Sequence, residues 1–380
     1  MNPDEIKPRQ VIGQILAQTG NLTEQALDHA LFRISAILSM NFRDTNSLNP
    51  WFRNAIVKKQ IENILREYTG QVVRLTENQT RKIWELTEEK NDQMVIGKLL
   101  EATGATIFIG KLYKYLNRLI PEKTDPRLSI TVTKEAVEQV LKSPRNTQAL
   151  NAFLNRKVDG LNLSARVWRL TDETVQPLIE SFLTQGIESG TPAATISRDM
   201  KQYLREPNKL FRRVRNKETG KLELSSAAKD YHPGQGVYRS SHMNARRLAS
   251  NEILLAYRAA DHERWASLDF IRGIKIPVSE SHGTRMPDGD ICDQLQGNYP
   301  KEFFFTGWHP ICRCYASSIT LPKEDFIKRL MGDPIEVKPV DIPSEFKQYL
   351  KDNQERIEGW KSTPYWIKYN KSTVDYILKK

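Results

Sequence analysis

Apolar side chains recur at helical spacing through the first two-thirds of the chain, and this pattern constrains the fold more than any other sequence feature. From Leu27 to Leu38 they return every three or four residues, which is typical of one buried helical face. Thr23 precedes this segment and is a favourable N-cap residue, so we expect a helix to begin there. None of the segments keeps a heptad repeat, which favours packed bundles over a long coiled coil.

Proline, threonine and glycine residues indicate where further helices begin and end. Asn49-Pro50 predicts a helix start, and Gly70 predicts the end of that helix. Thr76 stands three residues before Gln79, which is the spacing of a capping box, and predicts another start. A later helical block is expected at residues 133–204, with a break at Gly160.

The pattern changes to β after a helix that is expected from about Ser240. Ile274 and Ile276 alternate with other residues, which indicates a strand, and a closing strand is expected within Arg313 to Ile319. The predicted fold class is therefore mainly α, with N-terminal helical bundles, a small α+β module near the C-terminus and an extended C-terminal arm.

We expect five consecutive segments in this chain of 380 residues. They are an N-terminal helical domain at 1–122, a second helical region at 133–204, a basic loop segment at 205–239, the α+β module at 240–320 and a C-terminal arm at 321–380. The arm contains several prolines and aromatic residues, and we expect it to pack on a partner.

The chain carries a formal net charge of +11, and most of that excess lies between residues 205 and 247. Basic surface attracts polyanions, so double-stranded DNA is a candidate partner, and an acidic protein surface or plain solvation are the alternatives. The stretch around 216–221 is expected to form a hairpin or loop tip. The candidate contact residues are Arg205, Lys209, Arg212, Arg213, Arg215, Lys217 and Lys221.

No apolar run approaches the roughly 18 residues that a bilayer-spanning helix needs. The first residues also lack the charged-then-apolar form of a secretory signal. We therefore expect no membrane segment and synthesis in a cytoplasm.

All three cysteines fall within 23 residues, together with one histidine. Cys292, His309, Cys312 and Cys314 form a nitrogen and sulfur set of the kind that zinc prefers, and His282 is a possible replacement for one of them. The Cys-x-Cys spacing requires two alternate residues to tilt towards one ion. A disulfide from Cys292 to either of the other two cysteines, or three reduced and buried thiols, are the alternatives.

The same residues carry a resemblance to a known family. Asp290-Ile291-Cys292 followed by His309-Pro310-Ile311-Cys312-Arg313-Cys314 resembles the C-terminal signature of phage Mu F-like head morphogenesis proteins. The preceding helix is similar too and keeps Glu252, although Ser250-Asn251 stands where the family has Arg-Thr. Many members have a second cysteine just after the first, where this chain has Asp293-Gln294-Leu295, and this difference gives His309 more importance.

The resemblance covers roughly residues 240–320 and implies a low-copy structural protein of a tailed phage or prophage. Such a protein associates with portal or capsid subunits and acts in capsid assembly, genome packaging or genome delivery. It is found in the virion head, and in the host cytoplasm during assembly.

The alternative is a zinc-dependent nucleic-acid-binding protein or nuclease. Asp261-His262-Glu263 is interpreted as a solvated helix face, because adjacent helical residues point in different directions. We therefore predict no catalytic residue and no enzyme activity. Glu252 and Arg313 are expected to be structural, with Glu252 pairing Arg246 or Arg313 or supporting His309.

Overall fold

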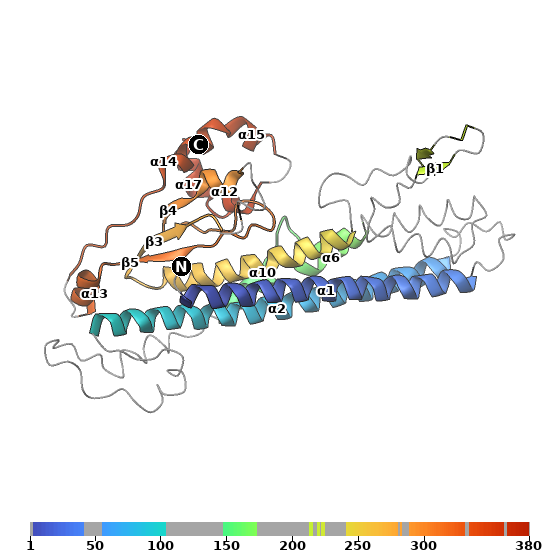
Figure 1. Cartoon of the computed structure of the whole chain (residues 1–380), viewed down its shortest axis with the longest axis horizontal. Helices are drawn as coiled ribbons and strands as arrows, with labels where there is room; N and C mark the ends of the chain where they lie inside the picture. Colours follow the sequence, from blue (N-terminus) through green and yellow to red (C-terminus); the bar gives the residue numbers. More distant parts are fainter. Residues whose placement is uncertain are drawn as a thin grey trace, which may run out of the picture. The chain divides into compact units, whose positions relative to one another are not determined.

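The computed structural model in Figure 1 describes residues 3–41, 55–103, 147–172, 213–215, 219–220, 222–224, 241–279, 282, 289–330, 334–360 and 363–379. The described part is mostly helical, with a small three-stranded antiparallel sheet near the C-terminus. This confirms the fold class expected from the sequence.

The described residues belong to two compact units, and neither unit is contiguous in the sequence. One comprises Met1–Gln10, Arg81–Phe153 and Leu254–Lys380, and the other comprises Val11–Thr80 and Leu154–Ile253. The five segments expected from the sequence are consecutive, and the structural units interleave because single long helices supply residues to both.

Long helices dominate the chain. Helix α1 spans Pro3–Asn41, α2 spans Ala55–Thr103 and α10 spans Ser241–Ala266. In the second unit, apolar residues of α1 and α2 bury one another together with Leu163 and Val167. The buried faces follow the helical periodicity of the sequence.

The threonines that were expected to start helices lie inside longer ones instead. The Thr23 hydroxyl donates to the carbonyl of Thr19, and the Thr76 hydroxyl donates to the carbonyl of Val72. A threonine hydroxyl can bond either a free N–H at a helix start or the carbonyl four residues back, so its presence does not locate a start. Gly70 likewise lies within α2 and does not end it.

The predicted break at Gly160 is confirmed. Helix α5 spans Thr147–Asn155 and α6 spans Leu163–Leu170, and Gly160 between them has a φ of +79°. This left-handed conformation is one that glycine adopts without a steric penalty. Helix α6 is capped by Asn162, whose side chain accepts a hydrogen bond from the Ala165 amide at 2.8 Å.

The expected hairpin is also present. Strands β1 (Arg213–Arg215) and β2 (Leu222–Leu224) pair antiparallel, with Val214 opposite Glu223.

The first unit contains the three-stranded sheet in the order β4-β3-β5. Strand β3 spans Ile271–Ile276, β4 spans Gly297–Pro300 and β5 spans Ser317–Thr320. Both neighbours pair antiparallel with β3, which ends before Pro277 because proline has no N–H to continue the ladder. A Cβ at Gly273 would lie 2.5 Å from the Tyr299 carbonyl oxygen of strand β4, so this position of the central strand has no room for a side chain.

The remaining described helices lie in this same unit. They are α12 (Ile291–Leu295), α13 (Lys323–Leu330), α14 (Ser344–Asp352), α15 (Gln354–Glu358), α16 (Tyr365–Lys368) and α17 (Lys371–Ile377).

The C-terminal segment belongs to the core of the module and is not an arm that packs only on a partner. Phe346 and Trp366 are buried against Tyr299, Phe303 and Trp308, with ring centroids 5.5 Å apart for Phe303 and Phe346. The expected boundary at residue 320 is therefore too early. Periodicity could not reveal this packing, because the described helices after residue 343 are short and bury at most two residues each.

Asn370 attaches this segment to the module. Its side-chain oxygen accepts from the Phe304 amide at 2.8 Å, and its side-chain nitrogen donates to the carbonyls of Phe304 at 2.9 Å and Trp366 at 2.8 Å. The side chain is buried, so each of these bonds replaces one to water that the folded state has lost.

We predict that Asn370→Asp destabilises the first unit by about 2 kcal/mol or more, because both donor bonds are lost and a charge is buried. Chemical unfolding followed by tryptophan fluorescence measures this. Asn298→Asp is the matched control, because Asn298 is exposed and the same change there should have little effect. Equal effects of the two substitutions would contradict the role of Asn370.

Candidate metal centre

The site begins at the short helix α12, whose start is fixed by a capping box. The Asp290 carboxylate accepts from the Cys292 amide at 2.6 Å, and the Asp293 carboxylate accepts from the Asp290 amide at 2.7 Å. Two unpaired amides are satisfied in this way, and helix α12 holds Cys292 in a buried position.

The second part of the site is a turn from His309 to Cys312. The Cys312 amide donates to the His309 carbonyl at 3.1 Å, with Pro310 in the second position of the turn and Ile311 in the third. Ile311 has a φ of +58°, where a type II turn normally has glycine or asparagine. A β-branched residue is strained in this conformation, so the surrounding structure must hold the turn in place.

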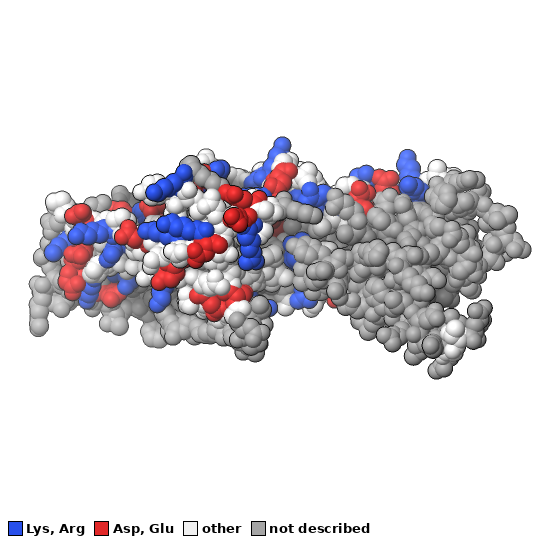
Figure 2. All heavy atoms as spheres, turned by 90° about the horizontal axis from the view of Figure 1, so that it is seen from above, with Lys and Arg blue, Asp and Glu red and all other residues white. Residues whose placement is uncertain are grey.

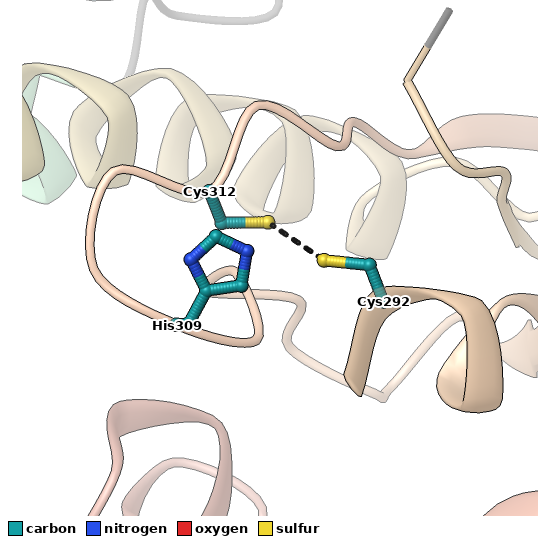
Figure 3. Close-up of side chains that lie close together, drawn as sticks. All are labelled: Cys292, His309 and Cys312. Atoms are coloured by element: carbon teal, nitrogen blue, oxygen red, sulfur yellow. Dashed lines mark hydrogen bonds between the residues drawn. The ribbon is translucent and has the colours of Figure 1, made fainter. Parts of the chain in front are cut away.

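These two parts bring three metal-ligating side chains together (Figure 3). One ligand atom from each of Cys292, His309 and Cys312 lies within 4.8 Å of the other two. The two sulfur atoms point toward each other and are 3.8 Å apart, with the imidazole beside them. Both cysteines are buried, whereas 31% of the His309 side chain is exposed.

Cys314, the fourth ligand expected from the sequence, is buried nearby but does not belong to this group of three. Burial alternates along the extended segment, with Cys312 and Cys314 buried and Arg313 between them exposed. Alternate residues of an extended chain share one face, so the Cys-x-Cys spacing directs both side chains inward. All three cysteines are free thiols.

Arg258 of helix α10 holds this segment from the other side. Its guanidinium donates to the carbonyls of Thr306 at 2.9 Å, Cys312 at 2.6 Å and Cys314 at 3.0 Å. The residue is buried, and its guanidinium carbon lies 5.0 Å from the centre of the Phe305 ring.

The neighbouring thiols and Arg258 shift the pKa values of the three cysteines in different directions. Contacts with Cys292 and Cys314, together with the charge of Arg258, lower the pKa of Cys312. The pKa of Cys292 is raised by its contact with Cys312 and by burial. Contact with Cys292 lowers the pKa of Cys314, but Cys312 and burial more than offset this and raise it to about 11.

A second group of possible ligands shares Cys292 with the first. His282, Asp290 and Cys292 also place one ligand atom each within 4.8 Å of one another. His282 Nε2 lies 2.9 Å from an Asp293 oxygen and 3.3 Å from an Asp290 oxygen. The other Asp290 oxygen lies 3.3 Å from His309 Nε2, and His309 Nδ1 lies 2.8 Å from the Pro310 carbonyl oxygen, so an ion would have to replace one of these two partners.

The sulfur separation excludes a disulfide in this structure, because a disulfide needs about 2.05 Å. Two sulfurs bound to one tetrahedral zinc ion at about 2.3 Å each are about 3.8 Å apart, so the arrangement of Cys292 and Cys312 fits a shared metal ion. It fits two reduced thiols in contact equally well.

The predicted structural role of Glu252 is correct, but the predicted partners are wrong. Its carboxylate bonds Arg156 at 2.5 Å and Arg166 at 2.8 Å. Burial raises the pKa of Glu252, but the two arginines more than offset this, so the pKa lies below its usual value. Arg313, the other residue expected to be structural, is exposed.

The interpretation of Asp261 as part of a solvated face is also wrong. Asp261 is buried and bonds Lys90 at 2.6 Å and Asn91 at 2.7 Å. Sequence reasoning also missed Arg258. The available signal was the apolar run from Leu254 to Ala260, in which a lone arginine must be buried with partners.

The basic segment is only partly described. Of its candidate contact residues, Arg213 and Arg215 lie in strand β1. They stand opposite Leu224 and Leu222 of β2. Arg205, Lys209, Arg212, Lys217 and Lys221 lie outside the described residues. On the surface of the described residues in Figure 2, basic and acidic side chains are intermixed. No helix among the described residues is long and apolar enough to cross a membrane.

Comparison of the chain with protein-family models, with curated proteins and with solved structures found no match.

We predict that Glu252→Gln lowers the unfolding free energy of the second unit by about 3–5 kcal/mol at neutral pH, because two buried arginines lose their counter-charge. The folded pKa of Glu252 lies below its ordinary value of 4.5, so its contribution is present above that pH and is lost as the pH falls through the folded pKa. Denaturant unfolding between pH 7 and pH 3 measures both effects.

The substitution should also remove part of the acid sensitivity of the second unit. Glu62→Gln is the matched control, because Glu62 forms an exposed pair with Arg66 that should contribute less than about 0.5 kcal/mol. A glutamine variant of Glu252 as stable as the parent would contradict the buried ion-pair role.

Proposed function

We propose that this protein is a minor head protein of a tailed phage or prophage, which associates with portal or capsid subunits and acts in capsid assembly, genome packaging or genome delivery. The observation that carries the proposal is that the residues of the Mu F-like signature have joint structural roles. Cys292 lies 17 residues or more before His309 and Cys312 in sequence, yet one ligand atom of each lies within 4.8 Å of the other two, and both cysteines are buried.

The burial of this cluster supports an assembly role over the nuclease alternative. A catalytic zinc ion keeps an open position for water or substrate, whereas a structural ion is enclosed by four protein ligands. Three cysteines here are buried, and only His309 borders solvent. A centre of this kind stabilises a small fold and supplies no nucleophile.

Zinc is the proposed cofactor. The ligands Cys292, His309 and Cys312 come from a capped helix and a strained turn, which are local structures that place them before an ion binds. The bound ion would supply folding free energy, because the unfolded chain does not offer the same arrangement.

Double-stranded DNA remains a proposed second partner of the basic segment at 205–239. Arg213 and Arg215 stand two positions apart in a strand of a hairpin, a spacing that favours contact with successive phosphates. Binding of this type should weaken steeply with salt and show little sequence preference.

We expect the full chain, coexpressed with the portal and capsid genes of its own phage, to copurify with portal or capsid subunits at a low and fixed ratio. Size-exclusion chromatography with mass determination measures that ratio. Free protein in every fraction, or metal-dependent DNA cleavage that is lost in His309→Ala, would contradict the proposal and favour the nuclease.

We also expect about one zinc ion per chain after purification under reducing conditions, because Cys292, His309 and Cys312 can bind one ion together. Elemental analysis measures the content. Cys312→Ser should lose the ion, whereas Arg313→Ser, the same replacement at the exposed neighbouring position, should keep it. A folded, metal-free parent chain would remove the zinc proposal and leave the assembly role standing.

A further inference from the structure

A second group of metal-ligating side chains adjoins the proposed zinc site and shares only Cys292 with it. His282, Asp290 and Cys292 each place one ligand atom within 4.8 Å of the other two. His282 lies in the chain that follows strand β3, whereas Asp290 and Cys292 lie at the start of helix α12. Imidazole nitrogen, carboxylate oxygen and cysteine sulfur are all ligands that zinc accepts.

The three side chains are largely screened from water and are held by local contacts. Cys292 and His282 are 1% and 3% exposed, and the Asp290 side chain is 15% exposed. The His282 amide donates to the Ser279 carbonyl at 2.8 Å, and the Asp290 carboxylate accepts from the Cys292 amide at 2.6 Å. The group is therefore brought together by protein contacts that need no ion.

The Asp290 carboxylate divides its two oxygens between two histidines. One oxygen lies 3.3 Å from His282 Nε2, and the other lies 3.3 Å from His309 Nε2. Two ligand atoms bound at about 2.0 Å to one tetrahedral zinc ion are about 3.3 Å apart, so the first pair has the spacing of ligands on one ion. That oxygen also accepts from the Cys292 amide, and a carboxylate oxygen has a further lone pair for an ion.

The second group should bind an ion more weakly than the first. His282 Nε2 lies 2.9 Å from an Asp293 oxygen, and an ion would have to replace that contact. The second group also provides one sulfur, whereas Cys292, His309 and Cys312 provide two. Sulfur ligands select zinc more strongly than carboxylate oxygens do, so the two-sulfur group fills first.

We propose that His282, Asp290 and Cys292 form a second divalent-cation site, joined to the proposed zinc site through the Cys292 sulfur. It takes a cation that accepts mixed nitrogen, oxygen and sulfur ligands, such as zinc or cobalt, and it fills after the first site. The proposal rests on the zinc site proposed above, because both ions share Cys292.

The shared sulfur makes helix α12 the common anchor of both ions. The first ion would link the helix to the turn at 309–312, and the second would link the same helix to the chain after β3. A ligand that binds the folded chain and not the unfolded one stabilises the fold. Filling of the second site should therefore raise the thermal unfolding midpoint in a separate step at higher zinc concentration.

The test is zinc binding by the full chain under reducing conditions, measured by equilibrium dialysis with elemental analysis. We expect about one ion per chain at low free zinc and about two at high free zinc. His282→Gln should lose the second ion and keep the first, whereas Cys312→Ser should lose the first and keep the second. Cys292→Ser should lose both.

Two further variants separate ligand loss from misfolding. Asp290→Asn should lose the second ion but keep the fold, because asparagine caps a helix about as well as aspartate. His262→Gln is the matched control for His282, because His262 lies outside both ligand groups and stacks on Phe304, with ring centroids 4.7 Å apart. This control should keep both ions. Circular dichroism checks the fold of each variant.

The possible failures of the two proposals are distinguishable. A parent chain that takes up one ion at every zinc concentration would overturn the second site and leave the first standing. A second ion that binds His282→Gln and Asp290→Asn as well as the parent would lie elsewhere, which also overturns the inference. A parent chain that takes up no ion would remove both sites.

Discussion

Charges buried in helix α10 are the constraint on which the described structure depends most. The helix is apolar along much of its length, yet Glu252, Arg258 and Asp261 are all buried in it. Each charge is tolerable only where another segment supplies partners. Glu252 therefore requires Arg156 and Arg166, Arg258 requires the carbonyls of the 306–314 segment, and Asp261 requires Lys90 and Asn91. The helix thus specifies which segments must meet it.

This constraint explains the order within the cysteine cluster. The turn that carries His309 and Cys312 holds Ile311 at a positive φ, a conformation that costs free energy in isolation. Arg258 offsets this cost, because its three hydrogen bonds fix the chain on both sides of the turn. A bound ion would add a second restraint, from Cys292 on a helix whose start is itself capped. The arrangement of the candidate site therefore rests on protein contacts that need no ion.

The sequence allowed the fold class to be predicted because helical periodicity and strand alternation are local signals. It gave the break at Gly160, the hairpin around residue 218 and the helix at 241–266 for the same reason. Helix starts were predicted less well, because the hydroxyls of Thr23 and Thr76 bond within a helix as readily as at its end.

Long-range partners could not be predicted from local patterns. Glu252 bonds arginines 96 and 86 residues away, and Asn370 bonds a backbone 66 residues away. The convergence of Cys292, His309 and Cys312 was predictable because their residue types already indicated a shared site. The role of Arg258 was not predicted, because a single arginine has no characteristic spacing.

The difference between this chain and the Mu F-like signature has a structural counterpart. Where many members have a second cysteine, this chain has Asp293-Gln294-Leu295, and the Asp293 carboxylate caps helix α12 and bonds His282. A side chain engaged in these two contacts is directed to the start of the helix and to a histidine outside the Cys292, His309 and Cys312 group. The residues that follow Cys292 therefore supply a helix cap and no further thiol.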